Sequence, residues 1–133
     1  MTDSDRMAKG QEILRQLRGG GDAPVAGGAT AEVFPDLWKM IQEHVFGELW
    51  ARPGLGLRDR CLITITVLTA LARTEELRMH MHNALNMGIS EQEVLEMAMH
   101  VAHYAGWPTG VNACRVAKDV FAARKKRAEK STN

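Results

Sequence analysis

The sequence predicts an all-α protein of about six helices, and three observations lead to this fold class. Apolar residues recur at steps of three and four over most of the chain. Residues that cap or break helices stand where these patterns begin and end. The one β-branched run, at residues 62–68, has no second strand to pair with, so as a strand it would leave its backbone groups unpaired. We therefore expect a bundle of packed helices.

The first two predicted helices are separated by a glycine-rich loop. Residues 4–18 form the first helix, with Ser4 as its expected cap. Residues 19–29 contain glycine and proline and are expected to form a loop. A second helix is expected over residues 31–50, with Pro35 in its first turn. Their apolar stripes consist of Ile13, Leu14 and Leu17, and of Phe34, Leu37, Trp38, Ile41, Val45 and Leu49.

The run at residues 62–68 has two readings. Its alternation and its β-branched residues favour a strand. However, the apolar character continues to residue 72, and a run of that length bounded by charged residues is more typical of a buried helix. Since no other segment reads as a strand, we expect a helix.

Two further helices begin at recognisable capping residues. Thr74 is expected to cap a helix over residues 75–87, and Gly88 follows as a glycine suited to a left-handed helix end. Ser90 and Glu93 form a capping box that opens the next helix.

The last predicted helix begins near Pro108, after a stop at Gly106, and ends at the basic run 124–127. We expect a single domain over residues 1–133. Its core lies at about 31–123, after a helix and glycine-rich loop (1–30) and before a basic tail (124–133).

Composition excludes several classes of protein. The 133 residues carry a net charge of +1, with 45% hydrophobic and 25% charged residues, so nothing indicates binding to nucleic acid or to an anionic membrane. No stretch reaches the length of a membrane span, and residues 1–18 lack the apolar region of a secretory signal. We expect a cytoplasmic protein in which Cys61 and Cys114 are buried thiols.

His80 is the first candidate for chemistry. It follows Glu76 by one helical turn, and a carboxylate beside an imidazole can orient it and prepare it for proton transfer. The alternative is a surface contact without a role. His82 lies about 200° further around the same helix, so it lines another wall, faces solvent or meets another subunit.

Five arginines cluster within 27 residues and suit an anionic substrate, because arginine binds carboxylates with two hydrogen bonds. For some of them the alternative, a solvated face neutralised by acidic neighbours, must hold. No zinc-type spacing of histidine and cysteine is present, and we expect neither a metal nor a cofactor. The arginines are Arg52, Arg58, Arg60, Arg73 and Arg78.

Several separated motifs, in order, resemble the carboxymuconolactone decarboxylase family over about residues 34–122. They are GELWARPGL (47–55), RDRCLIT (58–64), EELRMH (75–80), ALNMGIS (84–90) with Glu93, YAGWP (104–108) and NACRVAK (112–118).

The resemblance implies an all-helical fold whose protomers interlock as dimers and assemble into hexamers. It also implies the cofactor-free decarboxylation of a γ-carboxylated unsaturated lactone in the breakdown of aromatic acids. The related alkylhydroperoxidases share the fold but use a C-x-x-C ahead of the histidine that matches His80. Arg73 and Glu76 occupy those two positions here, which argues against a thiol peroxidase.

The reaction assigns roles to the candidates. Arg52 or Arg58 would hold the substrate carboxylates, and His80 would donate the proton or stabilise the developing oxyanion. Glu76 would orient His80, and Glu48 would serve as a second acid. Two further residues, His82 and Met87, are expected in the substrate-binding wall.

The chain also departs from the family pattern on the helix of His80. His82-Asn83 stands where a basic residue followed by a small one is expected, and methionine occupies positions 79, 81 and 87. These departures leave two alternatives open. One is a family member acting on a different small acid or lactone as an isomerase, cyclase or hydrolase. The other is a helical oligomer without enzymatic activity.

Overall fold

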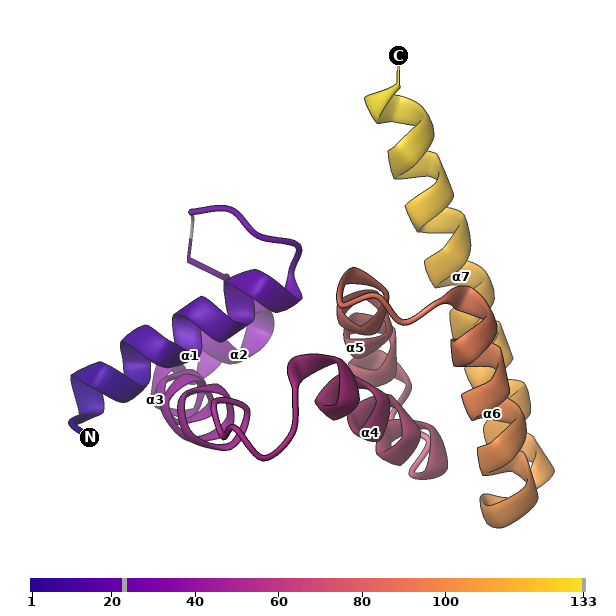
Figure 1. Ribbon diagram of the computed structural model, residues 1–133, viewed down its shortest axis with the longest axis horizontal. Helices are drawn as coiled ribbons and strands as arrows, with labels where there is room; N and C mark the ends of the chain where they lie inside the picture. The colour runs from indigo at the N-terminus through magenta and orange to yellow at the C-terminus, as the bar shows by residue number, and fades with distance from the viewer. Residues whose placement is uncertain (23, 133) are drawn as a thin grey trace. The chain divides into compact units, whose positions relative to one another are not determined.

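All regular secondary structure in the described residues, 1–22 and 24–132 of a computed structural model, is helical (Figure 1). The predicted fold class is therefore confirmed. Ala23, within the predicted loop, and Asn133 lie outside the described residues. The elements are α1 (Asp3–Leu17), α2 (Gly28–Val33), α3 (Pro35–Met40), a π-helix η1 (Ile41–Leu49), α4 (Leu57–Ala70), α5 (Thr74–Asn86), α6 (Glu91–Ala105) and α7 (Trp107–Ser131).

The chain divides into two compact units, Met1–Leu57 and Arg58–Asn133. The expectation of one domain over 1–133, with its core at 31–123, stays a prediction.

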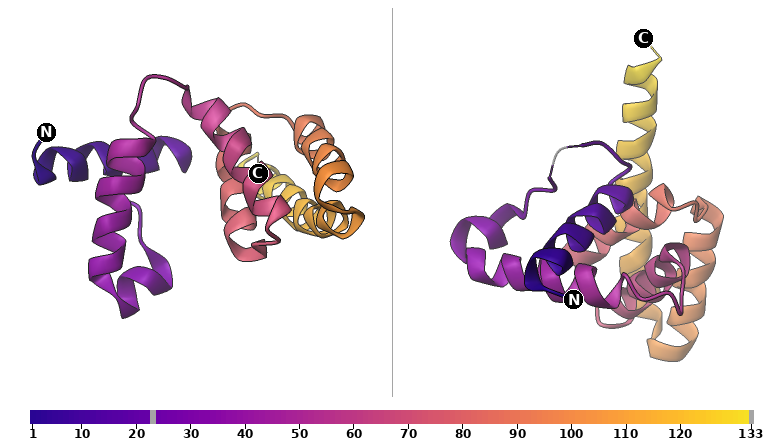
Figure 2. Two further views of the ribbon diagram at one scale, coloured as in Figure 1. Left: turned by 90° about the horizontal axis from the view of Figure 1, so that it is seen from below. Right: turned by 60° about the vertical axis from the view of Figure 1, so that its left-hand side comes forward.

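In the first unit, α1 lies across η1 and packs closely on it (Figure 2). Two glycines make this packing possible. A Cβ on Gly10 would lie 1.9 Å from the carbonyl oxygen of Gln42, and one on Gly47 would lie 2.3 Å from that of Arg6. The buried apolar side chains of the unit are Ile13, Leu14, Leu17, Phe46 and Trp50.

The expected helix over residues 31–50 is wrong in its continuity. Residues 31–33 belong to α2, and Phe34 then leaves the helical region with φ −141° and ψ 77°. The reason is Pro35, whose ring crowds the preceding residue out of the α conformation and starts a new helix. The expected cap of the first helix is also wrong. Thr2, not Ser4, caps α1 and forms a capping box with Asp5.

In the second unit, the ambiguous run at residues 62–68 is helical, as expected, and lies inside α4. The hydroxyls of Thr64 and Thr66 donate to the carbonyl oxygens four residues earlier, which lets β-branched polar residues fit a helix. One face of α4 buries Cys61, Ile65 and Thr69, whereas Ile63, Val67 and Leu71 remain 50%, 48% and 60% exposed.

Helices α6 and α7 lie side by side, and α5 also packs on α7 (Figure 1). The capping box of Ser90 and Glu93 at the start of α6 is confirmed, as is the left-handed glycine Gly88, whose φ is 93°. Thr74 is the first residue of α5 rather than its cap. That position belongs to Arg73, whose side chain makes no capping hydrogen bond.

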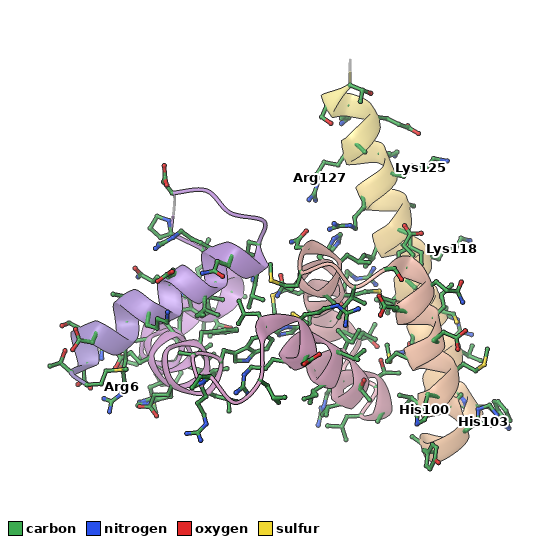
Figure 3. The ribbon with its side chains drawn as sticks, viewed as in Figure 1. Arg6, His100, His103, Lys118, Lys125 and Arg127 are labelled. Carbon is green, nitrogen blue, oxygen red and sulfur yellow. The ribbon has the colours of Figure 1, made fainter. Side chains whose placement is uncertain are left out.

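The last helix does not end at the basic run 124–127, as expected, but continues to Ser131. Lys125 and Arg127 lie on this extension (Figure 3), and Lys130 lies in its last turn, where a cation complements the partial negative charge of a helix C-terminus. Cys114 lies on this helix and is exposed, so its predicted burial is wrong, whereas that of Cys61 is confirmed. Among the described residues, no helix is long and apolar enough to span a membrane.

Candidate functional site

One face of α5 collects most of the predicted site residues of the second unit. Glu76, His80 and Met87 follow one another at helical spacing, and Asn83 lies between the last two. Glu76 is exposed, while His80 and Met87 are half-buried. Asn83 is only 1% exposed. The helix therefore presents a carboxylate, an imidazole and an amide along one stripe, which we call the His80 face.

The other side of α5 is fixed to α7 by polar contacts that set the orientation of the His80 face. The side-chain amide of Asn112 donates to Thr74 Oγ1 at 3.2 Å, and Arg124 donates to Asn86 Oδ1 at 3.0 Å. Arg78 on α5 forms an ion pair with Asp119 on α7 at 3.0 Å. Positions 76, 80, 83 and 87 consequently point away from α7.

The half-buried His82 lies off the His80 face, because it follows His80 by about 200° around the helix. Its assignment to the substrate-binding wall stays a prediction, as does that of Met87.

Arg58, a candidate for binding the substrate carboxylate, pairs with Glu93 across the start of α4 and the start of α6. The other carboxylate oxygen of Glu93 accepts the backbone N–H of Ser90 at 3.0 Å. This backbone hydrogen bond and the guanidinium both hold the pKa of Glu93 below its usual value, and Glu93 in turn raises the pKa of Arg58. Arg58 therefore has a structural partner, and its role in binding substrate stays a prediction.

A hollow of about 370 Å³ lies between α4 and α6. Its polar groups include the carboxylates of Glu93 and Glu96 together with His100, and His80 is not part of its lining. Two carboxylates make this hollow a poor receptor for an acidic substrate, because like charges repel. Its remaining lining consists of Leu62, Thr66, Met97 and Val101. Figure 3 shows His100 and His103 toward the same end of α6, where His103 packs edge-on against Trp107.

In the first unit, the predicted acid Glu48 lies on η1 and has two partners. Its carboxylate pairs with the guanidinium of Arg6 on α1 and contacts His44 Nδ1 at 3.2 Å. A π-helix is a rare conformation that often occurs at functional sites. Arg52 follows η1 and is exposed. The meeting of Glu48 and Arg52 with the His80 face stays a prediction.

The thiols give no support to peroxidase chemistry. Burial raises the pKa of Cys61 to about 11, so this side chain stays protonated near neutral pH and is a poor nucleophile. Cys114 is on α7, and neither cysteine forms a disulfide. Within residues 1–22 and 24–132, no three His, Cys, Asp or Glu side chains are grouped as metal ligands would be.

Comparison with known proteins identifies the family. Residues 35–119 match the model of the carboxymuconolactone decarboxylase family. The chain belongs to this family. It is 35% identical over 121 residues to 4-carboxymuconolactone decarboxylase of Acinetobacter baylyi, which covers 91% of this chain and 90% of the relative.

Two further relatives share smaller parts of the chain. A nitrosuccinic acid decarboxylase of Metarhizium robertsii is 35% identical over 56% of this chain and 52% of its own length. An uncharacterized 15.0 kDa protein of Paracoccus denitrificans is 31% identical over 71% of this chain and 72% of its own length.

Reasoning from the sequence missed two features of the candidate region. It noted Asn83 only as a departure from the family pattern, although its spacing of three from His80 places it on the same helical face. It also missed the contact of Glu48 with Arg6, because residues 42 positions apart give no local pattern.

Proposed function

We propose that this protein is a cofactor-free decarboxylase that converts 4-carboxymuconolactone, a γ-carboxylated unsaturated lactone, into 3-oxoadipate enol-lactone. The observation that carries the proposal is the 35% identity to a 4-carboxymuconolactone decarboxylase over nearly the whole of both chains. The His80 face of α5 supports it, because it provides groups for proton transfer and hydrogen bonding on one rigid helix.

The reaction needs three contributions from the protein. The bond between the γ-carbon and its carboxylate breaks, and CO2 leaves. The electron pair moves through the ring double bond onto the lactone carbonyl oxygen, which gives a dienolate. A proton is then added at the α-carbon, so that the double bond ends between the β- and γ-carbons. The protein must hold the acid, stabilise the oxyanion and deliver the proton.

The residues of this chain match these tasks. Arg52 or Arg58 binds the carboxylates of the substrate through its guanidinium group. His80 donates the proton at the α-carbon or a hydrogen bond to the oxyanion, with Glu76 orienting the ring. Glu48 is the second acid. The wall of the substrate site includes His82 and Met87.

We also propose that the protein forms a homohexamer built from dimers. It acts in the cytoplasm, in the β-ketoadipate route of aromatic-acid breakdown. Three exposed apolar side chains support association, because single chains rarely leave such a stripe in water: Ile63 and Val67 on α4, and Leu71 just after it.

A second candidate substrate is nitrosuccinate, which the relative from Metarhizium robertsii favours. Loss of CO2 from the carbon that bears the nitro group sends the electron pair onto the nitro oxygens. The demands on the protein are therefore the same three: an arginine for the acid, a donor for the developing anion and a proton for carbon.

The test is a decarboxylation assay of the protein dialysed against a chelator, with each acid as substrate. We expect release of one CO2 per lactone consumed, together with loss of the lactone absorbance. Arg52→Ala and Arg58→Ala should separate the two candidates for carboxylate binding, because KM will rise in the variant that lacks the arginine that binds the substrate. Arg115→Ala, on the exposed side of α7, is the control. Lactone turnover no faster than the uncatalysed reaction would overturn the proposed reaction.

A further inference from the structure

Asn83 is the one buried side chain on the His80 face of α5. It is 1% exposed, and its Oδ1 atom accepts no hydrogen bond within the described part of the chain. The other buried side chains near it on α5, Leu77, Met81 and Ala84, are all apolar. An amide at this depth is therefore an exception that requires a physical reason.

Other polar side chains of the second unit show what a satisfied amide looks like here. Asn86 accepts from Arg124, and Asn112 donates to Thr74, so the polar groups between α5 and α7 are paired. Thr69 also has a buried oxygen without a partner, but a threonine hydroxyl in a helix can rotate onto the carbonyl four residues earlier. The Oδ1 atom of Asn83 has no such choice, because it can only accept and the backbone N–H groups inside a helix already bond to carbonyls four residues earlier.

A buried amide oxygen without a partner is unfavourable, whereas an apolar side chain of similar shape at the same place would not be. The position is therefore explained if the partner comes from outside the protein. The helix places this amide three residues after His80, a spacing at which side chains on a helix are neighbours.

We propose that Asn83 is a substrate-binding residue whose amide meets the oxygen atom that takes up negative charge during decarboxylation. This inference rests on the proposed function and names a donor for its oxyanion. Rotation about the last side-chain bond exchanges the two ends of the amide, so the buried end presents N–H when an oxygen of the substrate faces it. A neutral donor at this point favours the dienolate without competing with the arginine for the carboxylate.

The test compares Asn83→Leu and Asn83→Asp with wild type. The leucine has a similar shape and no hydrogen-bonding group, and the aspartate keeps the shape but replaces the N–H2 donor with a charged oxygen. We expect kcat to fall by about 100-fold or more in both variants, the loss typical of one oxyanion donor, together with a smaller rise in KM because the amide also contacts the lactone oxygen before the reaction. We also expect Asn83→Leu to unfold at the same temperature as wild type or at a higher one, because it removes a buried group without a partner.

A purely structural amide would behave in the opposite way. The control is Ser90→Ala, which removes a satisfied cap hydrogen bond at the start of α6 and should lower the unfolding temperature without lowering kcat. If Asn83→Leu unfolds early and retains wild-type kcat in its folded fraction, the proposal fails. It also fails if the variant is more stable and fully active, because the partner of the amide is then a buried water. If the leucine variant does not fold, Asn83→Asp decides by the same comparison of kcat.

A binding experiment separates this inference from the proposed function. The probe is 5-oxotetrahydrofuran-2-carboxylate, a saturated lactone acid that has no ring double bond and so cannot decarboxylate by this route. We expect it to raise the unfolding temperature of wild type and to do so much less in Asn83→Leu. If wild type fails to turn over the unsaturated lactone but binds this probe through Asn83, the proposed reaction falls and the binding role stands. If wild type turns over the lactone and the two proteins bind the probe equally, the role of Asn83 is wrong and the reaction stands.

Discussion

The substitution Gly10→Ala tests the packing of α1 on η1, because helix propensity and steric contact change the free energy of unfolding in opposite directions. In an isolated helix, alanine is favoured over glycine by about 1 kcal/mol, so helix propensity alone predicts a more stable protein. In the folded chain, the added Cβ would lie 1.9 Å from the carbonyl oxygen of Gln42, well inside the 3.0 Å that such contacts require.

The contact is with backbone, so no side chain can move aside to relieve it. The helix α1 must shift by about 1 Å from η1, and this kind of overpacking typically destabilises a protein by about 1–3 kcal/mol. The destabilisation from overpacking exceeds the gain in helix propensity, so we expect Gly10→Ala to lower the free energy of unfolding by about 1–2 kcal/mol. Gly47→Ala lies at the same contact, 2.3 Å from the carbonyl oxygen of Arg6, and should behave alike.

The assay is urea unfolding, followed by far-ultraviolet circular dichroism and by tryptophan fluorescence. Trp50 is buried in the first unit and reports on its packing. Gly54→Ala is the control, because nothing lies within 4 Å of the added Cβ, and its stability should stay within about 0.5 kcal/mol of wild type. A Gly10→Ala variant more stable than wild type by about 1 kcal/mol would refute the close approach of the two helices.

Three further predictions concern the second unit. Burial raises the pKa of Cys61 from 9.0 to about 11. The contribution of the buried, protonated thiol to the free energy of unfolding is therefore fully present below pH 9 and is lost as the pH rises toward 11. Between pH 9 and pH 11, urea titrations should show that wild type and Cys114→Ala lose about 2 kcal/mol more unfolding free energy than Cys61→Ala does. The same dependence of unfolding free energy on pH in all three proteins would contradict this prediction. Ser90→Ala should lower stability by about 1 kcal/mol, because it removes the N-cap of α6. In wild type, the ion pair of Glu93 with Arg58 should stabilise the fold until acid protonates Glu93. Glu93→Gln removes this pair, so its denaturant midpoint should fall less on acidification than that of wild type. Midpoints that fall equally in both proteins would argue against the pair.

The sequence predicted most of the fold, because local signals mark most of its helix ends. Ser90 with Glu93 and the left-handed Gly88 were placed correctly, since capping depends on a few neighbouring residues. The run at 62–68 was correctly assigned as a helix from its length and its lack of partners, against its β propensity. Tertiary packing decides such cases more than propensity does.

The errors have identifiable physical causes. The break at Phe34 follows from the crowding by Pro35, which was taken as a residue of the first turn of a longer helix. The exposure of Cys114 depends on which side of α7 meets α5 and α6, and a mostly polar helix of 25 residues does not reveal this by its pattern.

The candidate site was predictable in part. His80 and Glu76 could be placed on one face from their spacing alone, and the three contacts of α5 with α7 explain why this face points away from α7. The burial of Asn83 could not be predicted, because a polar residue at helical spacing is ordinarily assigned to the solvent side.

The central claim is that an imidazole on the His80 face of α5 takes part in the decarboxylation. The most direct measurement is kcat/KM for 4-carboxymuconolactone in wild type, His80→Ala and His103→Ala, the last being an exposed histidine on α6. We predict a loss of about 100-fold or more for His80→Ala, the usual contribution of a positioned proton donor, and a change of less than about threefold for His103→Ala. Equal kcat/KM in all three proteins would contradict the account.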